Sequence, residues 1–278
     1  MARTISRPPR IAFVGAGNMA SSIIGGLLES GHPAERISAA DPFPASLERL
    51  RELAPVAVFD DNAAAVDGAD IIILAVKPQV MAEATDSISA AVLANSSLVI
   101  SIAAGVTIAS MQTRLSPQAA IVRCMPNTPA LLRCGASGLF ANPQTTSEQR
   151  DFAEQVLSAV GITCWVDTEG ELDAITALSG SGPAYFFLLM EAMMDAAEQL
   201  GLTRETANRL TLQTGLGAAR MALENNVELA ELRRRVTSPG GTTERAIESF
   251  ERDELRNTVA KAMRAASERA IEMSRELG

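Results

Sequence analysis

The sequence is poor in the side chains that many enzymes use to move protons. Its 278 residues include one histidine, His32, and two lysines, Lys77 and Lys261. A mechanism that needs histidine or lysine as the proton donor therefore has few candidates. The three cysteines are too few and too far apart in sequence for a zinc site or a disulfide framework. We expect reduced thiols in a cytoplasmic protein, with no metal site.

Basic residues and long apolar segments are also scarce. Asp and Glu number 33 against 24 Lys and Arg, a formal net charge of -9, which disfavours nucleic acid and anionic membranes as partners. Residues 1–10 lack the apolar segment of a secretory signal. The most apolar stretch, residues 184–194, is too short to span a bilayer and contains Glu191. We expect neither a nucleic-acid nor a membrane partner.

Short apolar segments alternate with helical stretches through residues 1–167. The segment 71–76 is almost uninterrupted, which is typical of a parallel strand buried on both faces. Repeated strand–helix units of this spacing predict an α/β domain with a doubly wound, Rossmann-like sheet. The expected strands are residues 10–15, 37–41, 56–59, 71–76, 98–102, 120–124 and 162–166, with helical stretches between them.

Residues 168–278 carry helix signals only, with breaks expected at 179–183, 201–203 and 237–241. The helix expected over 183–200 is apolar around most of its circumference, more than a helical domain of this size covers alone. We therefore expect an all-helical dimerisation domain whose apolar helix is covered by a second subunit.

A glycine-rich turn follows the first expected strand. Gly15, Ala16, Gly17, Asn18, Met19 and Ala20 form the pattern G-x-G-x-x-A at the start of a helix. Gly15 permits a tight turn, and Gly17 lets the backbone approach a pyrophosphate. The helix N-terminus then offers free N–H groups to the phosphates. The pattern predicts a dinucleotide site, with an ordinary tight turn as the alternative.

Two further residues lie at the carboxyl ends of expected strands, where such sheets bind ligands. Asp41, 24 residues after Gly17, can accept a hydrogen bond from a ribose 2′-hydroxyl and would repel a 2′-phosphate, which favours NADH. The alternative is an N-cap for the next helix. Lys77, followed by Pro78, could bind a phosphate or ribose, or be an ordinary surface lysine. Residues 101–105 and 125–129 are expected to border the nicotinamide.

Five segments together resemble the pyrroline-5-carboxylate reductase family. The similarity runs from about residue 10 to residue 278, and the segment SPGGTT is its most specific part. The segments are residues 13–19 (FVGAGNM), 75–78 (AVKP), 123–129 (RCMPNTP), 178–185 (LSGSGPAY) and 236–243 (VTSPGGTT).

The resemblance implies reduction of 1-pyrroline-5-carboxylate to L-proline with NADPH or NADH, the last step of proline biosynthesis. It also implies a homodimer formed by interlocking helices, which in the family often builds a decamer. The cofactor contacts that the resemblance implies, to which the strand pattern adds Asp41, are Gly15, Ala16, Gly17, Asn18, Met19, Asn62, Ala75, Val76, Lys77, Pro78 and Ala104. The implied substrate contacts are Ser179, Gly180, Ser181, Ser238, Gly240, Gly241, Thr242 and Thr243, with Thr243 as the catalytic hydroxyl at the ring nitrogen.

The chain departs from the family pattern at three positions. Members often have a polar or basic residue where Asp41 stands, so the choice between NADH and NADPH is open. Arg235 and Asn226 stand where some relatives have a cofactor-contacting Asn and a substrate-proximal Glu.

The scarcity of proton donors agrees with an imine substrate. A cyclic imine can be bound as its iminium, so it needs orientation more than a strong acid. Hydroxyls and the backbone N–H groups of Gly180, Gly182, Gly240 and Gly241 are sufficient to orient it and bind its carboxylate. The alternative for both glycine-serine segments is an ordinary turn between helices.

Two other functions are alternatives for a chain with this glycine pattern. β-Hydroxyacid dehydrogenases share the glycine pattern but rely on a lysine in the long helix after the Rossmann domain, and residues 183–200 contain none. A non-catalytic NAD(P)-binding protein would bind the cofactor without turning over an imine.

Overall fold

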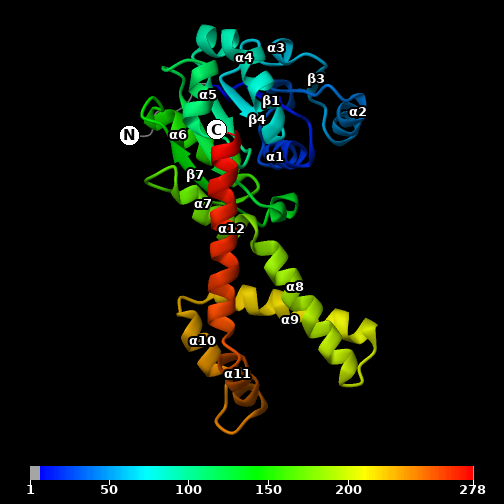
Figure 1. Cartoon of the computed structure of the whole chain (residues 1–278). Coiled ribbons are helices and arrows are strands. Elements are labelled where there is room, and N and C mark those ends of the chain that lie inside the picture. Colours follow the sequence, from blue (N-terminus) through cyan, green and yellow to red (C-terminus); the bar gives the residue numbers. More distant parts are fainter. Residues whose placement is uncertain (1–6, 278) are drawn as a thin grey trace. The chain divides into compact units, whose positions relative to one another are not determined.

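A computed structural model describes residues 7–277 of the chain, and within them the chain forms two compact units (Figure 1). Unit one consists of residues 7–181 together with residues 266–277, and unit two is Gly182–Ala265.

Unit one is built on a single eight-stranded sheet with the order β3-β2-β1-β4-β5-β6-β7-β8. All neighbouring strands are parallel except β6 and β7, which are antiparallel. The first six strands have the order 3-2-1-4-5-6 of dinucleotide-binding folds, so the predicted doubly wound sheet is confirmed. The strands are β1 Ile11–Val14, β2 Ile37–Ala40, β3 Ala57–Phe59, β4 Ile71–Leu74, β5 Leu98–Ser101, β6 Ile121–Met125, β7 Gly135–Ala141 and β8 Gly161–Trp165.

Strand β7 corrects the sequence prediction, which expects only helical structure between β6 and β8. Its sequence, GASGLFA, is rich in residues with low strand propensity. The small residues serve close packing instead. A Cβ atom on Gly138 would overlap the side chain of Ile175, and one on Gly135 would lie 2.8 Å from the carbonyl oxygen of Val160.

Helices cover both faces of the sheet, as the apolar strands require. Their ranges are α1 Asn18–Glu29, α2 Pro44–Leu53, α3 Asn62–Ala65, α4 Met81–Asn95, α5 Ile108–Arg114, α6 Ser147–Ser158 and α7 Glu171–Ile175. Short 3-10 turns span η1 Ala34–Arg36, η2 Pro78–Val80 and η3 Thr128–Leu132, and a π-helical turn, η4, spans Thr176–Gly180.

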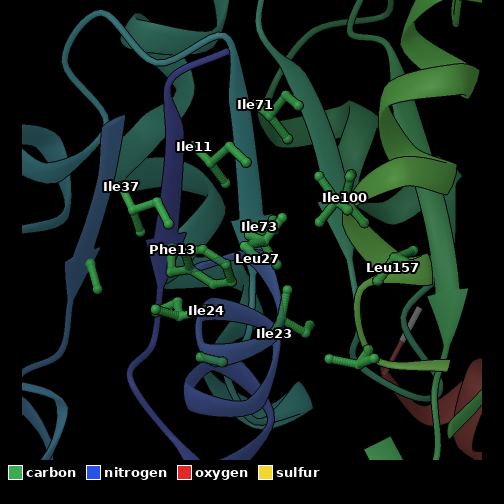
Figure 2. Packing of buried hydrophobic residues seen from close by; sticks show 14 of the residues in the cluster. Ile11, Phe13, Ile23, Ile24, Leu27, Ile37, Ile71, Ile73, Ile100 and Leu157 are labelled. Atoms are coloured by element: carbon green, nitrogen blue, oxygen red, sulfur yellow. The ribbon is translucent and has the colours of Figure 1, made fainter. Parts of the chain in front are cut away.

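The core divides according to strand alternation. Ile11 and Phe13 of β1 lie in one buried cluster with Ile23 and Ile24 of α1 and Leu157 of α6 (Figure 2). Their strand neighbours Ala12 and Val14 belong to the other cluster, which includes residues of α4 and α5. Because successive side chains point to opposite faces, the central strands β1, β4, β5 and β6 contribute to both clusters. The carboxyl ends of the strands are thereby held in a rigid row.

Unit two and the chain's last helix contain no strand among the described residues, as the sequence predicts. The helices are α8 Gly182–Gln199, α9 Arg204–Glu224, α10 Leu229–Arg235, α11 Thr242–Arg252 and α12 Leu255–Leu277. Helix α12 begins in unit two and ends in unit one. Helices α8 and α9 pack against each other (Figure 1), with Gly215 of α9 so close to Met190 of α8 that a Cβ would lie 2.6 Å from the methionine Cε.

Helix α8 leaves large apolar side chains uncovered in the single chain. Phe186 and Phe187 are each 65% exposed and Leu188 is 67% exposed. This is the apolar helix for which the sequence predicts a second subunit as cover. Among the described residues, no helix is both long and apolar enough to cross a membrane.

The strand-containing region ends close to the predicted division of the chain at residue 167. The compact units separate later, after Ser181, because α7 and η4 pack on β6 and β7. A functional division between residues 167 and 168 stays a prediction.

Two adjacent glycines in α1 give a matched test of this packing. In Gly26→Ala the new Cβ would lie 2.5 Å from the carbonyl oxygen of Ala159, whereas in Gly25→Ala it meets no atom within 4 Å. We expect Gly26→Ala to lower the free energy of unfolding by about 1–3 kcal/mol through overpacking. Gly25→Ala should raise it by up to about 1 kcal/mol through helix propensity. Urea denaturation of both variants measures the difference, and equal effects would contradict the close contact between α1 and Ala159.

Candidate functional site

A pocket of about 350 Å³ lies in unit one at the carboxyl ends of β1, β4, β5 and β6. It brings together segments that the sequence assigned separately to the cofactor, the nicotinamide border and the substrate. The pocket is lined by Met19, Ala75, Val76, Lys77, Ile102, Ala104, Met125, Pro126, Asn127, Thr128 and Gly180.

The glycine-rich turn crosses tightly between neighbouring strands. Gly15 has φ +101°, and its N–H donates to the carbonyl oxygen of Ala40 at 2.7 Å. A Cβ at this position would lie 2.6 Å from the carbonyl oxygen of Ala75, the residue that follows β4. Glycine is therefore required here both by the backbone angle and by the close approach of β4.

The N-terminus of α1 fits a pyrophosphate. Gly17 stands at the N-cap position, no side chain caps the helix, and the first turn contains no acidic residue. A Cβ on Gly17 would meet nothing within 4 Å, so this side of the turn is open. Free N–H groups, a positive helix end and open space beside the backbone are the features that bind a dinucleotide phosphate.

Asp41 holds the glycine-rich turn in place. Its side chain is 8% exposed; Oδ2 accepts a hydrogen bond from Ala16 N–H at 2.8 Å, and Oδ1 accepts one from Phe43 N–H at 2.9 Å. Helix α2 begins at Pro44 with Phe43 at its cap position, so the alternative of Asp41 as its N-cap is wrong. Each carboxylate oxygen can accept a second hydrogen bond, so contact with a ribose hydroxyl stays a prediction.

Lys77 and Pro78 follow β4 as predicted. Lys77 is exposed and lines the pocket, and Pro78 begins the 3-10 turn η2. Within the part of the chain that the structure describes, no salt bridge involves Lys77. It is also the only titratable side chain among the described residues that line this pocket. The pocket thus offers one cation and otherwise backbone, apolar, amide and hydroxyl groups.

Asn62 lies at the same edge of the sheet but does not line the pocket. It begins α3, directly after β3, and its Nδ2 donates to the Ser87 hydroxyl at 3.0 Å. Strands β2 and β1 lie between β3 and β4, so this position agrees with a contact to the adenosine end of a dinucleotide, which stays a prediction.

The predicted substrate segment at residues 179–181 forms a π-helical turn where the sequence indicates only a break. Ser181 N–H donates to the carbonyl oxygen of Thr176 at 2.8 Å, and the Ser179 hydroxyl donates to that of Ile175 at 3.1 Å. Gly180 lines the pocket, and a Cβ there would lie 2.7 Å from Cε of Met125. Turns of this kind are frequent at functional sites.

Asn127 lines the pocket and lies in the segment 125–129 that is predicted to border the nicotinamide, although the sequence assigns it no individual role. Its Nδ2 donates to the Ser179 carbonyl oxygen at 3.0 Å, and its Oδ1 accepts from Ala136 N–H at 2.9 Å. The segment MPNTP predicts a rigid border, but nothing in the sequence alone indicates which backbone groups its amide meets.

The second predicted substrate segment lies in unit two, between α10 and α11. Gly240 has φ +71°, and Gly241 N–H donates to the Ser238 carbonyl oxygen at 2.9 Å, which closes a turn. The exposed Thr242 and Thr243 are the first residues of α11. Gly240 N–H, predicted to bind the substrate carboxylate, donates to Oε2 of Glu244 at 2.7 Å. This contact was not apparent from the sequence.

The remaining rare side chains lie outside the pocket. His32 follows α1, and burial lowers its pKa, so it is neutral at pH 7. Burial raises the pKa of the Cys124 thiol to about 12, which leaves it unreactive. The described residues include no group of His, Cys, Asp or Glu side chains that could hold a metal ion.

Two protein families match this chain. Residues 10–105 match the family described as NADP oxidoreductase coenzyme F420-dependent, and residues 169–273 match Pyrroline-5-carboxylate reductase dimerisation.

Individual proteins match over nearly the whole length. The pyrroline-5-carboxylate reductase of Pseudomonas aeruginosa is 55% identical over 97% of this chain and 98% of that protein. The solved structure of a pyrroline-5-carboxylate reductase from Coxiella burnetii is 46% identical, with a TM-score of 0.93 over 96% of this chain and 99% of that one. The Plasmodium falciparum pyrroline carboxylate reductase, solved with NADP bound, is 28% identical, with a TM-score of 0.83 over 96% of this chain and 98% of that one.

The open side of Gly17 gives a test of dinucleotide binding. Because Gly17 has φ −73° and ψ −175°, Gly17→Ala fits the backbone without strain, and its methyl group enters space that is open in the structure. We expect the Kd for NADPH to rise by roughly tenfold or more, about 1.4 kcal/mol, with little change in Tm. Fluorescence titration and thermal melting measure the two effects.

Gly25→Ala is the matched control, because it also adds a methyl group to open space beside α1. It should leave the Kd for NADPH unchanged. Equal affinities of both variants and the wild type would show that Gly17 does not border the phosphates.

Proposed function

The chain belongs to the pyrroline-5-carboxylate reductase family, and we propose from this that it reduces 1-pyrroline-5-carboxylate to L-proline with NADPH or NADH. The observation that carries the proposal is the 55% identity to the Pseudomonas aeruginosa reductase over 97% of the chain, which includes both units. The reaction is the last step of proline biosynthesis. The pocket supports it, because segments predicted for cofactor and substrate meet there.

The cofactor is proposed to lie across the carboxyl edge of the sheet. Gly15 to Met19 would contact the pyrophosphate, Asp41 and Asn62 the adenosine, and Ala75 to Pro78 with Ala104 the nicotinamide half. The open N-terminus of α1 and the space beside Gly17 fit this group. When bound, the nicotinamide coenzyme supplies the hydride that the imine carbon receives.

The chain's own contribution is to bind and orient the substrate. Ser179, Gly180 and Ser181, together with Ser238, Gly240, Gly241 and Thr242, are proposed to bind the carboxylate and the ring. Thr243 is proposed to hydrogen-bond the ring nitrogen and to hold or relay its proton. Lys77 is the one titratable group that lines the pocket among the described residues, so orientation is a better account of this pocket than strong acid catalysis.

The domains are proposed to divide the work. Residues 1–167 would bind NAD(P)H, and residues 168–278 would carry dimerisation and substrate contacts. The match of residues 169–273 to a dimerisation family and the exposed phenylalanines of α8 support a homodimer, with a decamer as the larger assembly. We propose the cytoplasm as its location, in agreement with three cysteines that are all free.

Consumption of NADPH and of NADH, measured in parallel with purified protein and 1-pyrroline-5-carboxylate, tests the function directly. Oxidation of either coenzyme with formation of proline is expected. Coenzyme binding without turnover would contradict the proposal and support a non-catalytic NAD(P)-binding protein.

Asp41→Asn separates two effects of this carboxylate. The variant puts an NH₂ group where one oxygen accepts a backbone N–H, so kcat/KM should fall with both coenzymes. Loss of the negative charge should at the same time raise the NADPH-to-NADH ratio of kcat/KM by about tenfold. Steady-state kinetics with each coenzyme give both numbers.

The matched control is Asp61→Asn. Asp61 caps α3 through a bond from Ala64 N–H at 2.8 Å, and asparagine caps a helix equally well. Its coenzyme ratio should equal that of the wild type. An unchanged ratio in Asp41→Asn would restrict Asp41 to holding the glycine-rich turn.

Thr243→Val removes the proposed hydroxyl while it keeps the side-chain shape. We expect kcat/KM for 1-pyrroline-5-carboxylate to fall by about tenfold to a hundredfold, because the ring nitrogen loses its partner. Thr243→Ser should retain most of the activity. Thr258→Val, at an exposed position of α12, is the control, and an equal loss in both valine variants would remove Thr243 from the mechanism.

A further inference from the structure

The side-chain amide of Asn127 connects the turn after β6 to two other segments of unit one. Its Nδ2 donates to the carbonyl oxygen of Ser179 at 3.0 Å, and its Oδ1 accepts from the N–H of Ala136 at 2.9 Å. Ala136 lies at the start of β7, and Ser179 lies in the π-helical turn η4. One side chain thus holds the pocket's border against the segment predicted to bind substrate.

The chemistry of the two partners determines the orientation of this amide. The Ser179 carbonyl only accepts and the Ala136 N–H only donates, so a reversed amide would make two repulsive contacts in place of two hydrogen bonds. An aspartate at this position could satisfy Ala136 but would put a carboxylate oxygen against the Ser179 carbonyl.

The Ser179 carbonyl lacks the donor that an α-helix would supply. In an α-helix it would accept from the residue four positions later, but that residue is Pro183, which has no N–H. Asn127 supplies a donor. The next residue, Gly180, is so close to Met125 that a Cβ would lie 2.7 Å from its Cε. Residues 179 and 180 therefore both lie against the end of β6 and the turn that follows it.

We propose that Asn127 is a positioning residue for the imine substrate, which acts by holding residues 179–181 at the pocket. This inference rests on the proposed function. The amide of Asn127 bonds to backbone groups of β7 and η4, and the proposed effect on substrate passes through the η4 segment that it holds. Its loss raises the KM for substrate and affects coenzyme binding much less.

Asn142 offers a matched comparison within the same unit. Its Oδ1 accepts from Ile121 N–H at 3.0 Å, and its Nδ2 donates to the Ala119 carbonyl oxygen at 2.8 Å. It follows β7 and meets the residues at the beginning of β6, at the other end of these strands from the pocket. A change from asparagine to aspartate replaces the Nδ2 donor by an oxygen at both positions, although Asn142 is the more buried residue and its Oδ1 also accepts from the Thr145 hydroxyl at 2.7 Å.

The experiment compares Asn127→Asp and Asn142→Asp with the wild type by steady-state kinetics, NADPH titration, thermal melting and hydrogen–deuterium exchange. In Asn127→Asp we expect the KM for 1-pyrroline-5-carboxylate to rise by about tenfold or more, with kcat and the Kd for NADPH within about threefold of the wild type. Amides of residues 176–181 should exchange at least about tenfold faster. Asn142→Asp should lower Tm without either effect.

If the aspartate variant does not fold, Asn127→Ala is measured in its place, because it removes both hydrogen bonds without adding a charge. Wild-type KM and wild-type exchange at residues 176–181 in the Asn127 variants would overturn the inference, as would an equal rise in KM in Asn142→Asp. A wild-type protein that does not turn over the imine would refute the proposed function instead. The exchange measurement would then still decide whether Asn127 holds the segment.

Discussion

The parallel pairing of β1 with β2 and with β4 is the constraint on which the site depends. Because these strands run in the same direction, the turns that follow them leave the sheet at one edge. The pairing also brings the end of β4 against the glycine-rich turn, so closely that Gly15 has no room for a side chain. Asp41, at the end of β2, completes the arrangement through its bond to Ala16 N–H. The geometry of the turn that we propose to bind the phosphates is thus a consequence of the sheet.

The pocket works with few charged groups. Lys77 is its one titratable lining residue in the described part of the chain, and the other polar contributions come from backbone, amide and hydroxyl groups. Such groups orient a ligand without a change of protonation, which suits a reaction whose hydride comes from the coenzyme. Lysine and histidine are rare in the sequence, and the pocket is lined mainly by uncharged groups. Both observations fit a reaction that depends on orientation of the substrate more than on acid catalysis.

Several features of the site could be predicted from the sequence because they depend on local pattern. The glycine-rich turn, the position of Asp41 after β2 and that of Lys77 after β4 follow from short apolar segments and the residues that end them. Strand β7 could not be predicted, because its glycines are required by close packing against Ile175 and Val160, which lie far along the chain. The π-helical turn at Thr176–Gly180 could not be predicted, because a glycine-serine segment is equally typical of a break between two helices.

The sequence by itself determined the class of fold, the order of its parts and the family, because periodicity and short motifs are local properties. Only the tertiary structure decided which hydrogen-bonding groups already have a partner within the chain. Asp41 bonds to Ala16 and Phe43, Glu244 takes the N–H of Gly240, and Asn127 joins Ser179 to Ala136. The bonds of Asp41 to Ala16 and of Asn127 to Ser179 join residues 25 and 52 positions apart, a separation over which no sequence pattern specifies a partner. The sequence shows which hydrogen bonds a side chain is able to make, but the packing of the folded chain determines which partner that side chain meets.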